Sequence, residues 1–414
     1  GSMLFSKRSE LFLPKFWPAY FKKSKGCEIW DLKGNKFTDV SLMGVGTNIL
    51  GYGNKKVDNA VKKIIKLGNM STLNCPEEVM LAEEMIKLNK WSDAVRFTRS
   101  GGEANSVAIR IARAASNKEG VAICGYHGWH DWYLAANLKS TKNLNNHLIQ
   151  DLNPKGVPSN LKNTVFTFEY NNISSLKKII REHDIGTIKM EVKREEDPKN
   201  NFLQEVRKIA NKKNIILIFD ECTSGFRKTF GGLHKYYKVK PDMAMFGKAL
   251  GNGYAITSVI GKRSIMENAS TNFISSTMWT ERIGTSAAIE SLKVMEKMKS
   301  WEMISETGSW LKKQWKKLAK LHDLKIDVKG LDAIPNFIFR SQNHTSYKTL
   351  ITQELLKKNL LEKNKIFISI LHNKKNLQDY LNELDSVFSL IKKIENGDKV
   401  ENYLKHPKSY NPYI

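Results

Sequence analysis

The sequence has few cysteines, and the four that it has lie far apart. Cys27, Cys75, Cys124 and Cys222 form no Cys-x-x-Cys pair. Disulfide frameworks and zinc sites both depend on cysteines with characteristic spacing. We therefore expect four reduced thiols, mostly buried, and no metal site.

Long apolar runs are also missing. No stretch approaches the roughly 20 apolar residues that span a bilayer, and no signal-peptide pattern follows Met3. The 414 residues are 41% hydrophobic, which is enough for one large domain and a smaller one. We expect a soluble, cytoplasmic chain without a membrane partner.

Arginine is scarce for a chain with a net charge of +25, because only 12 of the 67 basic residues are arginines. The lysines are dispersed, as in Lys177-Lys178 and Lys312-Lys313. Nucleic-acid-binding proteins concentrate their basic residues where they contact phosphates. Dispersed lysines indicate solvated helix faces instead, so we expect no nucleic-acid partner. A non-catalytic basic binding protein stays open as an alternative, and an anionic small substrate is compatible with the charge.

The hydrophobic pattern divides the chain into three parts. Residues 1–50 form an arm, interrupted by Pro14 and Pro18, and a hairpin over 28–39. Residues 51–290 alternate helix and strand, and residues 291–414 form a smaller α+β unit. The predicted helices are 54–66, 77–88, 105–115, 173–182, 201–211, 286–318 and 377–395; the predicted strands are 94–98, 121–124, 185–192, 215–219, 243–246, 259–260, 324–328, 336–339 and 366–370. Strands separated by helices predict an α/β fold with a mostly parallel sheet covered on both faces.

Two residues suggest covalent chemistry. Lys248 lies in an apolar run that breaks into glycines, and Asp220 ends the apolar strand 215–219. A desolvated lysine can lose its proton near neutral pH and attack a carbonyl. A carboxylate at the carboxyl end of a buried strand lies where open α/β sheets bind ligands. Together they suggest a Lys248 Schiff base to pyridoxal phosphate, with Asp220 facing the pyridine nitrogen.

A glycine-rich turn precedes this pair. Ser100, Gly101 and Gly102 lie between the strand at 94–98 and the helix at 105–115. Two glycines let backbone N–H groups approach an anion, and a helix amino end adds partial positive charge. We expect the turn to hold a phosphate, although such a turn is also an ordinary strand-to-helix connection.

Aromatic and imidazole side chains follow the next strand. Tyr126 could stack on a heterocycle. His127 and His130 with Asp131 could instead suggest a metal, but the sequence places no further ligand nearby. We therefore expect packed histidines and no metal.

Four motifs in order carry a family resemblance: Ser100-Gly-Gly-Glu-Ala104, Tyr126-His-Gly128, Phe219-Asp-Glu-Cys-Thr-Ser-Gly-Phe-Arg227 and Phe246-Gly-Lys-Ala-Leu-Gly-Asn-Gly253. The sequence resembles the class III pyridoxal-phosphate-dependent aminotransferases, and within them the glutamate-1-semialdehyde aminomutase-like proteins. The resemblance runs from about residue 10 to about residue 395. It implies fold type I, with a mostly parallel seven-stranded sheet domain and a smaller C-terminal α+β domain, and a homodimer with active sites at its interface.

The resemblance also assigns roles. Lys248 and Asp220 would be catalytic, with Lys248 carrying the imine and Asp220 pairing with the ring nitrogen. Ser100, Gly101, Gly102 and the partner-reaching Thr277 would hold the phosphate. The remaining predicted cofactor contacts are the ring-stacking Tyr126, His127, Glu191 and Cys222.

Some positions depart from the family pattern. Cys222 stands where valine is usual, Gly102 replaces a threonine of the phosphate site, and Val192 replaces a proline after Glu191. The resemblance therefore leaves the substrate open. We expect an aminotransferase that uses an amino acid donor and a small carbonyl acceptor, such as a sugar-derived or surface-polysaccharide precursor. A glutamate-1-semialdehyde-type 2,1-aminomutase is the alternative. Arg8, Arg194 and Arg282 are candidate substrate-binding residues, because a guanidinium suits a carboxylate or phosphate.

Overall fold

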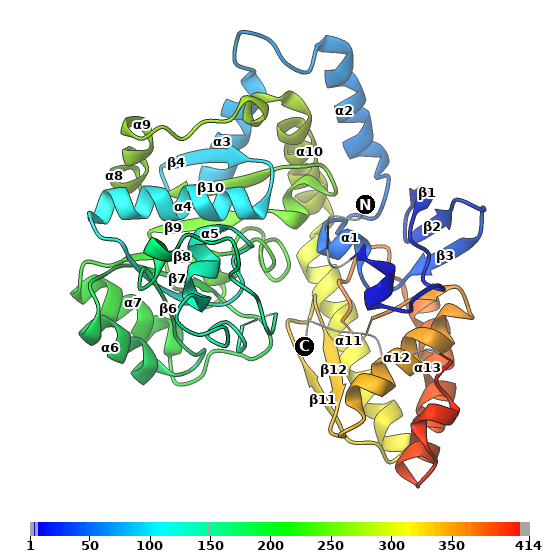
Figure 1. The fold of residues 1–414 in the computed structure, drawn as a ribbon. Coiled ribbons are helices and arrows are strands. Elements are labelled where there is room, and N and C mark those ends of the chain that lie inside the picture. The colour runs from blue at the N-terminus through cyan, green and yellow to red at the C-terminus, as the bar shows by residue number, and fades with distance from the viewer. Residues whose placement is uncertain (1–3, 5–6, 148, 364, 406–414) are drawn as a thin grey trace. The chain divides into compact units, whose positions relative to one another are not determined.

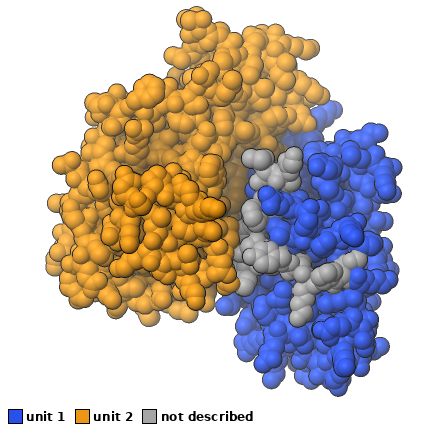
Figure 2. Space-filling view, in the orientation of Figure 1, with its two compact units in different colours: residues 1–55, 297–411 blue, residues 56–296, 412–414 orange. Residues whose placement is uncertain are grey.

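The computed structural model describes residues 4, 7–147, 149–363 and 365–405. These residues form two compact units (Figure 2). The large unit consists of residues 56–296. The small unit combines the described residues up to 55 with those from 297 on, so the predicted N-terminal arm and the predicted C-terminal domain contribute to one unit.

The large unit is built on a seven-stranded sheet (Figure 1). β10 is antiparallel to both of its neighbours, and the other pairs are parallel. This confirms the predicted α/β fold with a mostly parallel sheet. In sheet order, the strands are β4 (Ala94–Thr98), β10 (Thr257–Gly261), β9 (Met243–Phe246), β8 (Ile216–Asp220), β7 (Ile185–Glu191), β5 (Gly120–Cys124) and β6 (Val165–Thr167).

Helices pack on this sheet through its buried core. Apolar residues of α4 (Gly101–Ser116), among them Ala104 and Ala108, belong to the same buried cluster as Ile218 and Met245 of the sheet. The other helices of this unit are α2 (Lys55–Leu67), which begins at the unit boundary, α3 (Pro76–Leu88), α5 (Asp131–Leu134), α6 (Ile173–Glu182), α7 (Phe202–Lys212), α8 (Arg263–Met266), α9 (Asn268–Thr271) and α10 (Arg282–Met298), which ends just past it.

The small unit holds two further sheets. A four-stranded sheet has the order β1 (Phe21–Lys25), β2 (Glu28–Asp31), β3 (Lys36–Asp39) and β13 (Leu360–Leu361). The β2–β3 pair is the predicted hairpin. A two-stranded sheet pairs β11 (Ile326–Lys329) with β12 (Asn336–Phe339). The helices are α1 (Met43–Gly46), α11 (Ser300–Leu321), α12 (His344–Leu356) and α13 (Lys374–Glu395). The predicted extended arm contains a short 3₁₀ helix, Ser9–Leu11, before β1.

Two predicted elements differ from the structure in more than their end points. The single helix predicted over 286–318 is α10 followed by α11, because the backbone of Lys299 adopts a left-handed conformation with φ of 49°. The strand predicted over 366–370 is wrong. Its N–H groups bond in turn to Pro335, Ser41, Ala333 and Ile49, so the segment is held between two chain segments without forming a regular ladder.

Within the described part of the chain, the structure contains no helix that is both long and apolar enough to span a membrane.

Candidate active site

Four predicted residues lie together at the carboxyl edge of the large sheet. Asp220 is the last residue of β8 and Glu191 the last of β7, and the sheet register places the two side by side. Tyr126 and His127 follow β5, the next strand along. Because parallel strands end at one edge, these side chains converge where α/β sheets bind ligands.

Asp220 is a buried carboxylate with three neighbours. Its Oδ2 lies 2.9 Å from His127 Nδ1 and 3.9 Å from Lys189 Nζ, and its Oδ1 accepts the N–H of Cys222 at 3.1 Å. Burial alone would raise the pKa of Asp220, but Lys189 and His127 outweigh it and hold that pKa below its usual range. Asp220 is therefore an ionised acceptor.

His127 supports this carboxylate. Burial lowers the pKa of His127, so its ring is neutral. An ionised Asp220 can only accept, so we assign the His127 proton to Nδ1, which donates to Oδ2. Nε2 is buried and has no hydrogen-bond partner within the described residues.

The second histidine of this loop has a different partner. Nδ1 of His130 lies 2.6 Å from Ser106 Oγ in α4. His127 and His130 thus face different groups, and the described residues contain no cluster of histidine, cysteine, aspartate or glutamate suited to a metal.

Lys248 follows β9 and is held in a left-handed backbone conformation, with φ of 41°. Such a conformation is costly for a residue with a side chain and is concentrated at functional sites. Its Nζ donates to Thr223 Oγ1 at 2.6 Å. Burial lowers the pKa of Lys248 to about 8, so a substantial fraction of its amine is neutral near physiological pH.

Cys222 links the aspartate, the lysine and the glycine turn. Its N–H bonds to Asp220, and the next residue, Thr223, bonds to Lys248. A Cβ placed on Gly247 would lie 3.4 Å from Cys222 Sγ, and one on Gly101 would lie 3.8 Å from it. The thiol therefore lies beside the space that a side chain at Gly101 or Gly247 would occupy.

The predicted phosphate turn is the first turn of α4, which begins at Gly101 and not at 105 as the sequence suggested. Ser100 is the N-cap in a capping box with Glu103: the Glu103 carboxylate accepts the N–H of Ser100 at 2.9 Å, and Ser100 Oγ accepts the N–H of Glu103 at 3.4 Å. Gly101 and Gly102 are the first two helical residues, whose N–H groups have no carbonyl partner within a helix. They are the donors available to an anion.

Close packing explains the glycine at 102. A Cβ there would come within 2.8 Å of His130 Nε2, and a Cβ on Gly128 would come within 3.3 Å of the Gly102 Cα. The loop that follows β5 therefore rests directly on the first turn of α4, which brings Tyr126 and His127 to the same region as the glycine turn.

Glu191 is tied to its surroundings by two contacts. Its Oε2 accepts the N–H of Tyr126 at 3.1 Å and forms an ion pair with Arg194. The guanidinium Nη1 of Arg194 is buried and has no hydrogen-bond partner within the described residues. Arg194 is thus the candidate substrate arginine that the structure brings to this edge of the sheet.

Thr277 starts a 3₁₀ turn, Thr277–Thr280, and is exposed in the single chain. Arg99, the residue before the N-cap of α4, holds this turn by donating to the carbonyls of Met278, Trp279 and Glu281 at 2.7–2.8 Å. The segment that carries Thr277 is therefore fixed to the start of the glycine turn.

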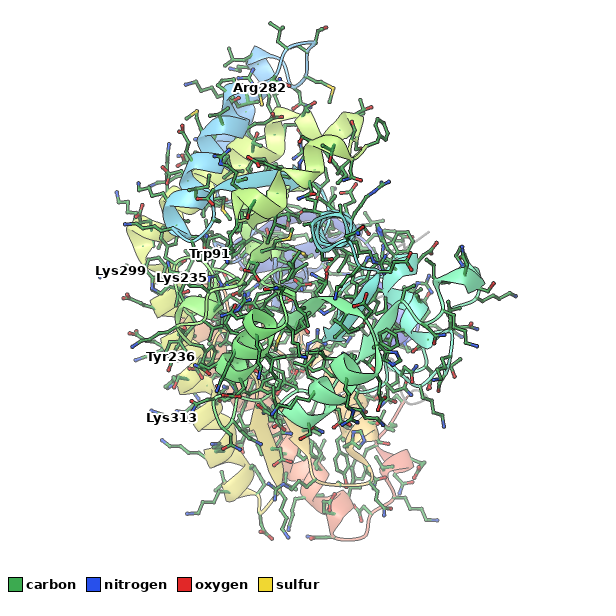
Figure 3. The ribbon with its side chains drawn as sticks, turned by 90° about the vertical axis from the view of Figure 1, so that its left-hand side faces the viewer. Trp91, Lys235, Tyr236, Arg282, Lys299 and Lys313 are labelled. Atoms are coloured by element: carbon green, nitrogen blue, oxygen red, sulfur yellow. The ribbon has the colours of Figure 1, made fainter. Side chains whose placement is uncertain are left out.

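The other two candidate arginines lie elsewhere. Arg282, labelled in Figure 3, forms a bidentate ion pair with Glu77 of α3 at 2.9 and 3.0 Å and donates to the carbonyl of Gly68. Arg8 is exposed in the small unit. The structure does not bring Arg282 into contact with Asp220, Lys248 or Glu191.

Three contacts at this site involve residues that the sequence pattern does not single out. Thr223 accepts from Lys248, Glu103 closes the capping box, and Lys189 lies beside Asp220. A serine followed three residues later by glutamate is a recognisable helix-start signature. A lysine inside the apolar strand 185–192 was a visible anomaly. Thr223 carried no signal outside its motif.

The large unit has the features that pyridoxal phosphate requires. The Gly101 and Gly102 N–H groups suit its phosphate, and the ionised Asp220 suits a protonated ring nitrogen. Lys248 offers a desolvated amine. These groups converge through Cys222 and Thr223, so the residues present fit the cofactor.

Comparisons with known proteins agree with this fit. The family model described as Aminotransferase class-III matches residues 14–366. The 3-aminobutyryl-CoA aminotransferase of Cloacimonas acidaminovorans is 30% identical over 85% of this chain and 83% of its own length. The glutamate-1-semialdehyde 2,1-aminomutase of Methanocaldococcus jannaschii is 31% identical over 81% of this chain and 79% of its own length.

Solved structures show the same fold. The FumI protein of Sphingopyxis sp. MTA144, solved as its pyridoxal phosphate internal aldimine, superposes with a TM-score of 0.86 at 21% identity, covering 97% of this chain and 95% of that chain. An omega-transaminase from Sphaerobacter thermophilus superposes with a TM-score of 0.81 at 19% identity, covering 94% of both chains. The chain therefore belongs to the class III aminotransferases, enzymes of fold type I whose cofactor is pyridoxal phosphate.

Proposed function

We propose that the chain is an intermolecular aminotransferase that takes an amino group from an amino acid donor and passes it to a small carbonyl acceptor through Lys248. One observation carries the proposal: a buried amine, hydrogen-bonded to Thr223 at 2.6 Å, is joined through Cys222 to an ionised Asp220. An amine that titrates near pH 8 can act both as a nucleophile and as a proton carrier.

Each of these residues has one task. When bound, pyridoxal phosphate supplies an electron-accepting ring that stabilises negative charge at the substrate carbon. Asp220 would hold the ring nitrogen through its negative charge and favour a proton there. The Lys248 amine, in its neutral form, would carry a proton to or from the substrate carbon. Thr223 holds the Lys248 amine in place while it is free.

The surrounding residues bind and orient the cofactor. The N–H groups of Gly101 and Gly102 take the phosphate, with Ser100 as the N-cap that starts the helix. Tyr126 and Cys222 would hold the ring between them when the cofactor is bound. Glu191 would line the site, and its ion-pair partner Arg194 would be available to bind an anionic group of the substrate.

A homodimer is part of the proposal. Thr277 is exposed in the single chain although Arg99 holds its segment firmly. Its apolar neighbours Phe273 and Met278 are 86% and 61% exposed, and Leu73 is 81% exposed. Exposed apolar side chains of this size favour burial against a partner. In a dimer, Thr277 would reach the phosphate bound by the partner subunit.

The carbonyl acceptor is proposed by class. Arg194 suits a carboxylate or phosphate on the substrate, with Arg8 and Arg282 as weaker candidates. A sugar-derived or surface-polysaccharide precursor in the cytoplasm remains the proposed acceptor. A 2,1-aminomutase, which moves an amine within one molecule, is the second candidate because of the aminomutase relatives at about 30% identity.

The test is spectral. The purified chain is loaded with pyridoxal phosphate, and amino acids are screened for bleaching of the imine absorption band. A transaminase needs a donor and a separate carbonyl acceptor to complete its cycle, whereas a mutase consumes a single substrate without a keto acid.

Lys248→Ala should abolish the covalent imine and leave the fold intact. Lys235→Ala is the matched control, because burial also lowers the pKa of Lys235 but its amine donates to the carbonyls of Leu88 and Phe230. A borohydride-reducible imine that persists in Lys248→Ala would show that another lysine is the anchor and would contradict the proposal.

A further inference from the structure

A lysine occupies a core position of the central sheet. The register of β7 places Lys189 between Ile123 of β5 and Ile218 of β8. Both isoleucines are fully buried, and Lys189 has no exposed surface. An ammonium group in such a place is strongly unfavourable unless an opposite charge compensates it. The position therefore calls for a reason other than packing.

The contacts of Lys189 point to the active site. Its Nζ donates to the sulfur of Met245 at 3.0 Å, which is a weak acceptor. The carboxylate with which it forms an ion pair is Asp220, whose Oδ2 lies 3.9 Å from Nζ. The charge of Lys189 is thus directed at the residue that faces the ring of the cofactor.

We propose that Lys189 is a positioning residue whose charge keeps Asp220 ionised, so that the proton shared by Asp220 and the ring nitrogen stays on the nitrogen. The inference rests on the proposed function, in which that nitrogen meets Asp220. Lys189 would act through Asp220 and would touch neither the cofactor nor the substrate.

Electrostatics gives the direction of the effect. The shared proton can lie on the ring nitrogen, which leaves a charged pair, or on Asp220, which leaves a neutral pair. Lys189 lies within the sheet core, whereas ligands approach Asp220 from the carboxyl edge of the sheet. The cation is therefore closer to the carboxylate than to the nitrogen. It stabilises the negative end of the charged pair more than it disfavours the positive end.

The other groups that face Lys189 cannot substitute for it. They are His127, Cys222 and Glu191. His127 is neutral, and burial raises the pKa of the Cys222 thiol, which keeps the thiol neutral as well. Glu191 is already paired with Arg194. Burial lowers the pKa of Lys189 and the charge of Asp220 opposes that fall, so the ion pair favours the charged amine. Lys189 is thus the basic side chain closest to Asp220 within the described residues, apart from the neutral His127.

Lys189→Met tests the proposal, because methionine has a similar length and no charge. The enzyme is loaded with pyridoxal phosphate labelled with ¹⁵N in the ring, and the nitrogen signal is followed by NMR at neutral pH. In the unmutated enzyme we expect the signal of a protonated ring nitrogen. In Lys189→Met the signal should shift toward that of a neutral, hydrogen-bonded pyridine.

A second readout uses the enzyme without its cofactor. Removal of an opposite charge within 4–6 Å should raise the pKa of Asp220 by about 1–3 units, measured from the ¹³C signal of its carboxyl group. Thr187→Val is the matched control. Thr187 is buried two residues earlier in β7, and its hydroxyl has no hydrogen-bond partner within the described residues. This variant should leave both signals unchanged.

Three outcomes are decisive. A shift in Lys189→Met but not in Thr187→Val supports the proposal. An unchanged ring signal in a folded Lys189→Met overturns it, and Lys189→Ile, which suits a buried strand, replaces the methionine variant if that does not fold. A neutral ring nitrogen in the unmutated enzyme overturns it without any variant. The Lys248 imine does not depend on Lys189. A borohydride test for that imine therefore distinguishes failure of the Lys189 proposal from failure of the proposed function.

Discussion

Lys248 owes its reactivity to desolvation. Burial is the largest influence on its pKa, which falls to about 8, while the carboxylate of Glu191 opposes the fall. Because only the neutral amine attacks an aldehyde, capture of pyridoxal phosphate by the cofactor-free enzyme should accelerate as pH rises and level off above about 8. Stopped-flow absorbance at a series of pH values measures this rate.

One result would contradict this expected pH dependence of the capture rate. An exposed lysine keeps a pKa near 10.4, so a rate that still rises steeply between pH 9 and 10 would show that Lys248 is not desolvated. Lys248→Ala gives the background rate from surface lysines.

The ionisation of Asp220 should make the free energy of unfolding depend on pH in the acid range. Its pKa in the folded chain lies below the unfolded value, so its contribution to the free energy of unfolding is present above about pH 4 and is lost as pH falls through the folded pKa. The loss should amount to about 1.4 kcal/mol per pH unit below pH 4. Urea unfolding of the cofactor-free enzyme and of Asp220→Asn between pH 5 and 3 isolates this slope as their difference.

The Asp220→Asn variant has no carboxylate to protonate at this position. Its free energy of unfolding should therefore fall less steeply with decreasing pH than that of the unmutated chain. The absolute stability of Asp220→Asn should nevertheless be lower at neutral pH, because the buried amine of Lys189 would lose its ion-pair partner. Parallel pH profiles for the two proteins would mean that Asp220 titrates normally in the folded chain.

At the scale of elements, Gly101 and Gly102 in the first turn of α4 allow a direct comparison of two alanine substitutions. A Cβ on Gly101 would meet Cys222 Sγ at 3.8 Å, an ordinary contact, whereas a Cβ on Gly102 would lie 2.8 Å from His130 Nε2. Gly102→Ala should therefore destabilise the cofactor-free enzyme by about 1–3 kcal/mol, the usual cost of overpacking. Gly101→Ala should be neutral or slightly stabilising, because alanine favours helices.

Thermal or urea unfolding of both variants without cofactor measures the difference. Equal stabilities would mean that the loop after β5 shifts away from α4 at no cost. Since that loop carries Tyr126 and His127, the Gly102→Ala variant should also bind pyridoxal phosphate more weakly.

The same element shows where sequence reasoning succeeded and where it ended. β5, β8 and β9 are predictable because they are continuous apolar runs, and Asp220 and Lys248 stand out as charged residues at or just after the ends of two of them. The predicted helix begins at 105, four residues after the start of α4, because glycines 101 and 102 favour a turn while the Ser100–Glu103 capping box marks the earlier start.

Other features depended on tertiary contacts. β6 has three residues, too few for a periodic signal, and forms by pairing with β5. The apolar segment 366–370 has the composition of a strand, but its N–H groups bond to two different chain segments. The hydrogen bond between Lys248 and Thr223 joins residues 25 positions apart, and no local pattern predicts it.

At the scale of the whole molecule, the proposed dimer connects surface and chemistry. Phe273 and Met278 flank Thr277 and expose large apolar side chains. If this segment is the interface, Phe273→Asp combined with Met278→Asp places two buried charges against the partner and should convert dimers to monomers at micromolar concentration. Sedimentation velocity measures the change. Leu321→Asp, at a residue of α11 that is 73% exposed, is the control that should leave the assembly unaltered.

Loss of the dimer should also weaken cofactor binding. Each phosphate in the proposed dimer is held by Gly101 and Gly102 of one subunit and by Thr277 of the other, so a monomer loses one of its contacts while Lys248 and Asp220 stay intact. The Phe273/Met278 variant should therefore still form the Lys248 imine, but with a pyridoxal phosphate dissociation constant raised by about tenfold, equivalent to the loss of one charge-assisted hydrogen bond of about 1.4 kcal/mol. If the monomer binds the cofactor as tightly as the dimer, Thr277 is not part of the phosphate site. If the variant remains dimeric, the segment around Thr277 is not the interface.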